Sequence, residues 1–542
     1  MKQGIRVYLY LFIIISFHLL ISSWRFSFSP FGSHVDGFWY HKIARNFAEG
    51  KGFVESSVLY FNPEPSSIVH PVSAMWNPLS YVLLGNSYKI LGISTLTARI
   101  PALIFDGIIA VLIFWFCVKI YQDLEISLLS SLIFSTHKFV LASRSIGGAP
   151  ESFHLFFVTL FCLSLGIAWT KSSFFYYSSF FAGLAYLTRN ESLWSILVII
   201  LIFMLKRRAS EIDTEKPSWR ILALSITVFL LVMMPWEIRN WIVYGSQANQ
   251  AKYSLLFARE YYDIWSSGKN PEGLWWFIQE YFALGFKQIF IQKFQSLYYK
   301  LDTCMQFLTW PLVLFLFVGI AKNFKEKKYW PAYAYFSITY ISMGLLNSLG
   351  QGGGWHAPGA LLAFIIPIVV SGCYYFGELV AQRKRTVKII GLLLSIFIFL
   401  YHLGDNYKQY RILQKNNFKI GSESYSLEIE KYLRSSTKNN KNLTPQQDNL
   451  TVMTHQPVIL NFYTNIPAVQ IPTNDSLEEV MRVAKKYHCN YLILTGILPS
   501  IFAKLYMEQE KIEGLKLVFE KTIPNIGIEG SGDRIKIYKI EL

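Results

Sequence analysis

Charged side chains are scarce in this chain of 542 residues. Asp, Glu, Lys and Arg make up 16% of it, whereas soluble domains average about 25%. Hydrophobic residues reach 52%, and aromatic residues alone reach 17%. This composition excludes a soluble globular protein and predicts an integral membrane protein. The formal net charge of +16 then reflects where Lys and Arg lie relative to the membrane, and no nucleic-acid partner is expected.

Cysteine and the common cofactor motifs are also scarce. The five cysteines are scattered, with no CxxC pair and no Cys/His spacing that suits zinc, so we expect buried thiols. The sequence has no Walker A loop, no GxGxxG after a strand, no DxD and no HExxH. A soluble nucleotide donor is therefore unsupported.

Apolar runs long enough to cross, or nearly cross, a hydrocarbon layer of roughly 30 Å recur along the chain. The candidate crossings, about eleven in number, lie near 7–24, 96–118, 126–142, 152–170, 174–187, 191–205, 220–236, 306–321, 330–348, 357–379 and 388–404. The first run lacks the small-residue cleavage pattern of a signal peptide, so we expect an uncleaved anchor. The run at 79–91 is short and contains Asn86 and Lys89, which favours an interfacial helix.

Lys and Arg are distributed unequally between the two sets of connections. If the N-terminus is inside, the inner connections are dense in Lys and Arg, whereas the short outer ones hold only Arg144 and Arg189. The positive-inside rule therefore predicts an N-in, C-out protein of the plasma (inner) membrane. Two large outer loops follow, at 25–95 and 237–304. The second is rich in Trp and Tyr, as expected of a segment that lies on the membrane.

The composition turns polar after about Asn406. The strand-like runs LTVMT, VILNFY, NYLILTG and RIKIYKI surround a helical stretch, SLEEVMRVAKKYH. We therefore predict a membrane domain over 1–405, which includes both outer loops, and a small extracytoplasmic α/β domain over 406–542. An Asn/Lys-rich linker, STKNNKNLTPQQDN, interrupts the second domain.

One carboxylate, Asp36, stands in the stretch SHVDGFWYHKIARNFAEGKGF of the first outer loop. It precedes an amphipathic helix and is a good N-cap, so a purely structural role stays open. The helix follows the anchor by only about a dozen residues, so it should lie flat at the outer interface and direct Asp36 toward the mouth of the bundle. A carboxylate placed there can also act as a base.

Two further acidic positions fall on the same side. Glu151 starts the fourth crossing, where a solvated helix-start Glu is the alternative. Arg189, Asn190 and Glu191 form the turn of a hairpin whose arms have only about 14 or 15 residues, or roughly 22 Å each. The turn should therefore sit recessed, near the lipid phosphates, where an ionisable group is a functional hypothesis. A self-paired turn of Arg189 with Glu191 is the alternative.

The stretch PWEIRNW ends the seventh crossing at Pro235 and brings Arg239 and Asn240 to the same surface. Arg239 can grip a phosphate bidentately or merely snorkel. The glycine run before the tenth crossing presents His356 at the rim, although a lone His is more often structural. Asp106, inside the second crossing, is better explained as a polar helix-packing contact. Together these groups suit chemistry on a membrane-embedded anionic substrate.

The stretches HVDGFWYHKIARNFAEGKGF, WNPLSYVLLGNSYKILGISTLTARIPALIFDGIIAVLIF, GLAYLTRNESLW and PWEIRNWIVYG resemble the GT-C class of membrane glycosyltransferases. The likeness is to the bacterial branch that includes dolichyl-phosphate-mannose protein mannosyltransferase-like and aminoarabinose-transferase-like enzymes, and it covers about residues 5–400. The C-terminal part resembles the outer soluble domains of many members. Gly37 stands where protein mannosyltransferases have an acidic residue, and the WWDYG motif of oligosaccharyltransferases is absent, so a protein acceptor is less expected.

The resemblance implies a polyprenyl-phosphate sugar as donor and transfer on the outer side of the membrane. The first-loop catalytic aspartate of the family carries over onto Asp36, and the second-loop acidic residue onto Glu151. Polyprenyl phosphate is an adequate leaving group, so the chemistry needs a cationic clamp, for which Arg189 and Arg239 are the candidates. Asp36 would take the proton of an acceptor hydroxyl that attacks C1 from the opposite face, with inversion.

Glu191, Asn240 and His356 are the remaining site candidates. No metal ligands are predicted, and whether the two carboxylates hold a divalent cation stays open. The acceptor is a lipid, a glycan or a protein. The alternatives are a transporter or flippase for lipid-linked sugars, which would place ionisable groups within several crossings, and a non-catalytic membrane protein that binds glycan.

Overall fold

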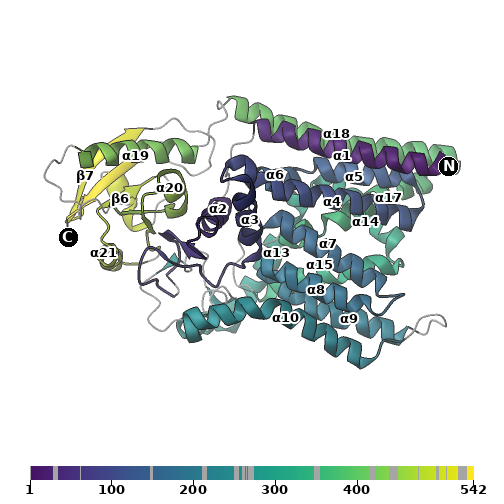
Figure 1. The fold of residues 1–542 in the computed structure, drawn as a ribbon, viewed down its shortest axis with the longest axis horizontal. Helices are drawn as coiled ribbons and strands as arrows, with labels where there is room; N and C mark the ends of the chain where they lie inside the picture. Colours follow the sequence, from purple (N-terminus) through teal and green to yellow (C-terminus); the bar gives the residue numbers. More distant parts are fainter. Residues whose placement is uncertain are drawn as a thin grey trace.

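The computed structural model describes residues 2–28, 35–61, 63–146, 150–209, 216–248, 256–258, 263, 265–266, 274–346, 355–415, 421–438, 450–473, 475–495, 500–507, 510–522 and 534–541. A helical bundle forms one end of the molecule and a smaller domain with a β-sheet forms the other, with α2 (Val35–Ala48) and α3 (Leu79–Leu91) between them (Figure 1). The two chain termini lie at opposite ends of the long axis (Figure 1).

Every predicted crossing contains a helix. These helices are α1 (Lys2–Phe28), α4 (Thr95–Tyr121), α5 (Leu124–Thr136), α7 (Glu151–Ile167), α8 (Phe174–Thr188), α9 (Ser195–Arg208), α10 (Trp219–Tyr244), α14 (Trp310–Asn323), α15 (Trp330–Leu345), α17 (Leu362–Val380) and α18 (Lys384–Lys415). Within the described residues, five are long and apolar enough to cross a membrane, namely α1, α4, α10, α17 and α18. The chain is therefore a multi-pass membrane protein, while the count of eleven crossings stays a prediction.

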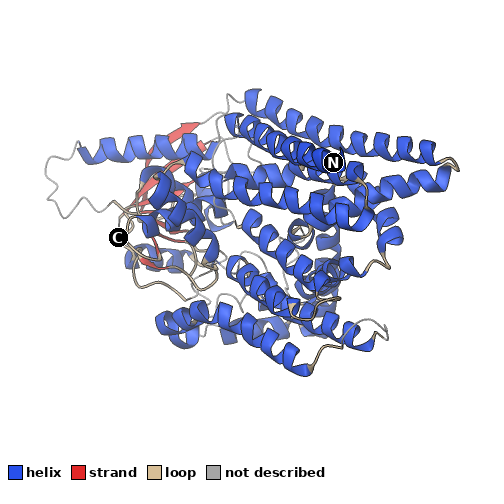
Figure 2. Ribbon diagram, turned by 45° about the vertical axis from the view of Figure 1, so that its right-hand side comes forward, coloured by secondary structure: helices blue, strands red, loops and turns tan. Residues whose placement is uncertain are grey.

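The bundle is built around α17, whose residues from Leu362 to Cys373 are buried throughout. Its closest neighbour is α14, and small residues allow the approach. A Cβ added to Gly319 would lie 2.0 Å from the carbonyl oxygen of Ile368, and one added to Gly372 would lie 2.2 Å from that of Phe315. Such close backbone contact is the usual way in which membrane helices pack, because it maximises van der Waals contact. Along one edge of the bundle, α1 and α18 lie side by side (Figures 1 and 2).

Two helix boundaries and one domain boundary differ from the prediction. The run at 126–142 is split at His137, whose backbone is extended, into α5 and α6 (Lys138–Ile146). The seventh crossing does not end at Pro235 but continues to Tyr244, because a proline removes a single helical hydrogen bond and membrane helices tolerate it. The predicted domain boundary at 406 falls inside α18, which continues to Lys415.

The outer loops contain helices of their own. The run at 79–91 is the helix α3, and α2 packs against it; its position at the membrane interface stays a prediction. The two-residue strands β1 (Val54–Glu55) and β3 (His70–Pro71) pair antiparallel between them. In the second outer loop, α12 (Leu274–Ala283) and α13 (Gly285–Leu308) precede α14, and α13 and α14 meet at a bend of 102°. Most of 249–273 lies outside the described residues.

The smaller domain is a six-stranded mixed sheet with strands in red at one end of Figure 2. Its order is β2-β5-β4-β6-β8-β7; the pairs from β2 to β6 are parallel and those of β8 are antiparallel. The strands are β2 (Ser57–Val58), β4 (Val452–Thr454), β5 (Ala468–Gln470), β6 (Tyr491–Leu494), β7 (Leu515–Thr522) and β8 (Arg534–Ile540). The helices are α19 (Gly421–Lys438), α20 (Pro457–Thr464), α21 (Leu477–Lys486) and α22 (Ala503–Tyr506).

Most predicted elements of this domain are present, with one error. The runs LTVMT, NYLILTG and RIKIYKI contain β4, β6 and β8, and the predicted helical stretch contains α21. The run VILNFY is not a strand but the helix α20, which begins at Pro457 and ends at Asn465 in a left-handed conformation. A short apolar run buried on several sides has no periodicity that separates a strand from a helix. The core of the predicted linker, 439–449, lies outside the described residues.

The first outer loop and the C-terminal domain share structure. Strand β2, from residues 57–58, is the edge strand of the C-terminal sheet and pairs with β5. Glu64 of the same loop forms ion pairs with Arg482 and Lys486 of α21, at 3.0 Å each. The sheet therefore includes a segment that the sequence assigned to the membrane domain.

Candidate active site

The helix α2, which carries Asp36, lies between α3 and α20. On its outer side, the ring of Phe38 lies 4.7 Å from that of Phe462, and the amine of Lys42 donates to the side-chain oxygen of Asn465 at 2.8 Å. On its other side, His41 bonds to the hydroxyl of Tyr88 on α3. The helix begins at Val35, so Asp36 lies in its first turn, and its side chain is half-buried. Asp36 is thus held by elements of both domains.

Arg189 is the centre of a compact ionic cluster. Helix α8 ends at Arg189 because the backbone of this residue is extended. Its Nε donates to Glu191 at 2.6 Å, and its Nη1 donates to Glu151, at the start of α7, at 3.1 Å. Its Nη2 lies 2.6 Å from Nδ1 of His356, which starts α16 (His356–Ala360). The side chains of Arg189, Glu151 and Glu191 are only 11% to 14% exposed, so the charges compensate one another in a nearly dry site.

The imidazole of His356 determines what Arg189 can still bind. Nδ1 of His356 lies 2.7 Å from Glu191 Oε1 and also 2.6 Å from Arg189 Nη2. One ring nitrogen cannot donate to the carboxylate and accept from the guanidinium at the same time. A carboxylate can only accept, whereas Arg189 Nη2 has a second acceptor in Nε2 of the same ring at 3.3 Å, so we assign the proton to Nδ1. One N–H group of Arg189 Nη2 then donates to Nε2 of His356, and the other is without an acceptor among the described residues, which leaves it available to an anion.

The electrostatics agree with this assignment. Burial alone would raise the pKa of Glu191, but Arg189 and His356 hold it well below its ordinary value. Burial and the neighbouring Arg189 lower the pKa of His356, so this imidazole is neutral at neutral pH. Glu191 is therefore an anion that fixes both the arginine and the histidine.

Tyr40 links Asp36 to the cluster. It lies one turn after Asp36 on α2 and is 2% exposed. Burial raises the pKa of its phenol, and the charged groups that also act on it are Arg189, Asp36, Glu151 and Glu191. The charge of Asp36 acts on His356 as well. The charge of Asp36 therefore lies near enough to act on two groups, Tyr40 and His356, on which the Arg189 cluster also acts.

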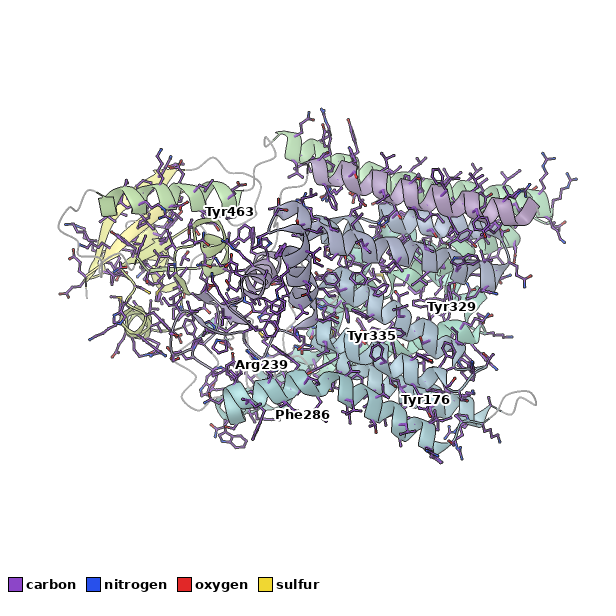
Figure 3. All side chains as sticks on the ribbon, viewed as in Figure 1. Tyr176, Arg239, Phe286, Tyr329, Tyr335 and Tyr463 are labelled. Carbon is purple, nitrogen blue, oxygen red and sulfur yellow. The ribbon has the colours of Figure 1, made fainter. Side chains whose placement is uncertain are left out.

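A second layer of side chains supports the cluster, and the sequence did not predict it. Nε2 of His154 lies 2.7 Å from the hydroxyl of Ser192, which lies 3.2 Å from that of Tyr335 on α15. All three are buried, and Figure 3 shows Tyr335 inside the bundle. His154 stands three residues after Glu151, on the same face of α7. That spacing was a usable signal, whereas the approach of Tyr335 from a distant helix was not.

Arg239 and Asn240 lie in a different place, near the C-terminal end of α10 (Figure 3). Nη1 of Arg239 donates to the carbonyl of Val72 and to the side chain of Asn240, at 2.9 Å each. The guanidinium also lies over the rings of Trp236 and Tyr244, at 4.7 and 5.6 Å. Arg239 therefore holds the first outer loop.

Close to Arg239, Glu55 forms the second buried polar centre of that loop. It accepts from the Trp39 indole of α2 at 3.0 Å and from the backbone N–H of Ser73 at 2.8 Å. Burial raises the pKa of Glu55, while His70 acts in the opposite direction. Through Trp39, Glu55 fixes α2 one turn after Asp36.

The remaining predictions have clear placements. Asp106 is buried and accepts from Ser152 of α7 at 3.1 Å, which is the polar helix contact expected of it. Asn190 donates to the carbonyl of Met75 at 2.8 Å. The five cysteines are buried and unbridged. Within the described ranges, no group of three or more His, Cys, Asp or Glu is arranged to hold a metal ion.

Comparisons with known proteins identify the architecture. Residues 70–238 match the family model for dolichyl-phosphate-mannose-protein mannosyltransferase. No curated protein matches the sequence significantly. The crystal structure of ArnT from Cupriavidus metallidurans bound to undecaprenyl phosphate is similar at a TM-score of 0.54 and 11% identity, over 97% of each chain. The apo structure of the same enzyme has a TM-score of 0.56 and 11% identity, over 99% of this chain and 98% of that one.

The matched family segment contains Glu151, Arg189 and Glu191 of the ionic cluster. The similarity to ArnT extends over nearly the whole length of both chains, so it includes the C-terminal domain as well as the bundle. The resemblance predicted from the sequence is thereby confirmed: residues 70–238 match the mannosyltransferase family model, and the chain is a multi-pass membrane protein with an ArnT-like fold.

Proposed function

We propose that the protein is an inverting glycosyltransferase that moves a sugar from a polyprenyl-phosphate carrier to a hydroxyl group on the outer face of the membrane. The family match and the ArnT-like fold support the class of reaction. ArnT has been crystallised with undecaprenyl phosphate, and a carrier of that chemistry suits a site that offers buried N–H groups at the end of membrane helices.

The observation that carries the proposal is the state of Arg189. Its Nε and Nη1 are fixed by two carboxylates, and its Nη2 donates to Nε2 of His356 through one N–H group and has no acceptor for the other among the described residues. A guanidinium held in this way is preorganised, so it needs no rearrangement when a phosphate oxygen arrives. Arg189 would bind the donor phosphate through Nη2 and stabilise the charge that develops on it as the sugar leaves.

Asp36 is the base in this mechanism. The acceptor oxygen attacks C1 of the sugar as the bond from C1 to the phosphate oxygen breaks, and the acceptor proton passes to the carboxylate of Asp36. Polyprenyl phosphate leaves as an anion against Arg189, so no general acid is required. Attack from the face opposite the phosphate inverts C1. The contacts of α2 with α20 and α3 fix the helix that carries Asp36, which supports this role.

Glu151, Glu191 and His356 act through Arg189. The two carboxylates orient the guanidinium and reduce its net charge, and His356 closes the ring of contacts around Glu191. Glu151 precedes Ser152, which donates to Asp106 of α4, and this bond anchors the first turn of α7. Direct contact of Arg239 and Asn240 with the donor stays a prediction; their contacts favour a supporting role in the first outer loop.

Asp36→Asn tests the proposal most simply. A deletion strain of the source organism, complemented with wild type or variant, is analysed by mass spectrometry of its envelope lipids and glycans. Asparagine keeps the shape but cannot accept the proton, so we expect the transferred sugar to disappear while membrane expression is unchanged. Glu49→Gln is the matched control, because Glu49 lies at the far end of the same helix and pairs only with Arg45 and Lys51 in the described structure.

Two further observations help to interpret the Asp36→Asn experiment. The purified Asn variant should still bind a polyprenyl phosphate, because Arg189 is intact. If the Asn variant restores the modified envelope as well as wild type does, Asp36 is a structural residue of α2 and the protein is a transporter or glycan-binding protein instead.

A further inference from the structure

The turn between α3 and α4 exposes a run of apolar side chains. Every residue from 89 to 96 is exposed. The run includes four large aliphatic residues that are 43% to 80% exposed, namely Ile90, Leu91, Ile93 and Leu96. We call these four residues the α3–α4 patch. An exposed apolar patch of this kind marks a surface that another apolar partner covers.

The backbone of the turn brings the four side chains together. Only Gly92, Ile93 and Ser94 separate the two helices. The N–H of Gly92 donates to the carbonyl of Tyr88 at 2.9 Å, and its φ of 83° favours glycine. The hydroxyl of Ser94 accepts from the backbone N–H of Thr97 at 3.0 Å and so caps α4. The patch therefore sits on a tight turn that is fixed at both helix ends.

The patch continues into the exposed apolar face of α4. This helix is one of those long and apolar enough to cross a membrane. Beyond Leu96, it exposes Ile104, Ile108 and Trp115. The four residues are spaced eight, four and seven positions apart, which is the spacing of a single helix face. The exposed apolar face of a membrane-crossing helix meets acyl chains, so the partner that fits the patch is the same hydrocarbon.

The length of α4 places the patch near the boundary of the hydrocarbon layer. The 27 residues of α4 span roughly 40 Å at 1.5 Å each, compared with roughly 30 Å for the hydrocarbon. When the helix is centred, its first turn extends about 5 Å beyond the acyl chains. Aliphatic side chains at that level reach the hydrocarbon, and the amine of Lys89 lies 4.0 Å from the ring of Phe47 at the polar side.

We propose that the α3–α4 patch inserts into the acyl chains of the leaflet that the predicted topology makes the outer one, and thereby anchors the first outer loop to the bilayer. The anchor acts on α2 through α3. A Cβ added to Gly85 of α3 would lie 2.5 Å from Cδ1 of Phe47 and 3.0 Å from the carbonyl oxygen of Ala44. Because the two helices pack this closely, the depth of the patch sets the height of α2 at the membrane. The inference does not depend on the proposed function.

Spin labelling tests the insertion directly. The five native cysteines are buried, so an introduced exposed cysteine takes the nitroxide label, and the wild-type chain measures the background. The full-length protein is reconstituted into vesicles of phosphatidylcholine and phosphatidylglycerol. Relaxation of the label is then compared in oxygen, which concentrates in hydrocarbon, and in a nickel chelate, which stays in water. Labels at Ile90→Cys and Leu96→Cys should respond more to oxygen than to the chelate.

Two further positions calibrate the depth. Val69→Cys is the matched control, because Val69 is an aliphatic residue of the same loop that is 60% exposed, near Glu64 and its ion pairs with the C-terminal domain. Ile104→Cys marks the hydrocarbon interior, since eight residues place it roughly 12 Å deeper than Leu96. We expect the ratio of oxygen to chelate response at Ile90 and Leu96 to exceed that at Val69 several-fold and to stay below that at Ile104.

Two results would overturn the proposal. A ratio at Ile90 and Leu96 equal to that at Val69 would place the patch in water. A weak response to both reagents at these positions would show that protein, such as a second copy of the chain, covers the patch instead of lipid.

Discussion

Arg189 and Arg239 began with the same predicted role, but the structure gives them different surroundings. Arg189 is enclosed by two carboxylates and a histidine that come from three separate segments. Arg239 holds a backbone carbonyl and its neighbour Asn240, and lies over two aromatic rings. The surroundings of Arg189 fix the position of its charge and leave an N–H group of Nη2 available. The surroundings of Arg239 fix the first outer loop.

The difference shows that residue type and membrane depth alone do not assign a role to an arginine. What separates the two is the identity of the acceptors. Carboxylates around Arg189 orient a cation in a dry site, where its charge acts strongly on a ligand. Arg239 instead donates to a backbone carbonyl and lies over two ring faces, so it orders the backbone and side chains of the loop. This arrangement requires no buried negative charge.

Removal of Arg189 should have the largest effect. In Arg189→Gln, Glu151 and Glu191 stay buried without their cation, so we expect a loss of about 3–5 kcal/mol of stability and a fall in transfer of at least about 100-fold. The second variant, Arg189→Gln with Glu191→Gln, should recover part of the stability and none of the transfer. Thermal unfolding and a transfer assay on the same preparations measure the two quantities. Equal recovery of both would give Arg189 a structural role only.

Phe462→Ala tests how far the C-terminal domain holds α2. Phe462 contacts Phe38 and His41, with ring centroids 4.7 and 4.9 Å apart, so its loss should let Asp36 move and reduce transfer about tenfold, as a misplacement of about 1 Å costs that much or more. Phe519→Ala is the matched control, because it removes the contact with Tyr432 inside the same domain, at 4.5 Å. We expect a similar loss of stability from both and a loss of transfer only from Phe462→Ala. A similar fall in transfer from both would contradict the account.

Arg239→Ala should have a smaller effect on chemistry than Arg189→Gln. It removes one bond to the Val72 carbonyl and two ring contacts, so we expect about 1–2 kcal/mol of lost stability. Its effect on the reaction should appear as a raised donor KM with kcat reduced less than threefold. Arg239→Lys keeps the positive charge but loses the planar group of N–H donors. It therefore separates a role of the charge from a role of the contacts that the guanidinium makes. If Arg239→Ala lowers kcat as strongly as Arg189→Gln does, both arginines bind the phosphate and the comparison fails.

Replacement of Glu55 should have the smallest effect on stability, and this effect should depend on pH. Burial raises the pKa of Glu55, so the folded state binds its proton more tightly than the unfolded state does. The contribution of Glu55 to stability therefore falls as the pH rises through that raised pKa. Glu55→Gln cannot ionise, so its unfolding temperature relative to wild type should increase from acid to neutral pH. A difference that is constant with pH would show that the charge of Glu55 is fully compensated in the fold.

The sequence predicted the helices better than the way they meet. A helix is present at every predicted crossing, because long apolar runs are local signals. Each member of the Arg189 cluster was also singled out, since an ionisable residue at membrane depth is rare enough to be conspicuous. The pairing of Arg189 with His356, 167 residues apart, depends on helix packing and had no local signal.

The errors have the same physical origin. The run VILNFY is apolar on all sides because α20 lies between its own sheet and α2, and burial on several faces removes the periodicity that separates helix from strand. Strand β2 has two residues, too few for any pattern, and only its pairing with β5 makes it a strand. Tyr40 and Tyr335 likewise matter through contacts made by distant segments.

The most direct test of the account is a structure of the protein bound to a polyprenyl phosphate. We expect a phosphate oxygen within hydrogen-bond distance of Arg189 Nη2, with Glu151 and Glu191 still on the other two nitrogens and Asp36 facing the side where the sugar would attach. A phosphate bound at Arg239, with the Arg189 cluster unchanged and remote from it, would contradict the central claim.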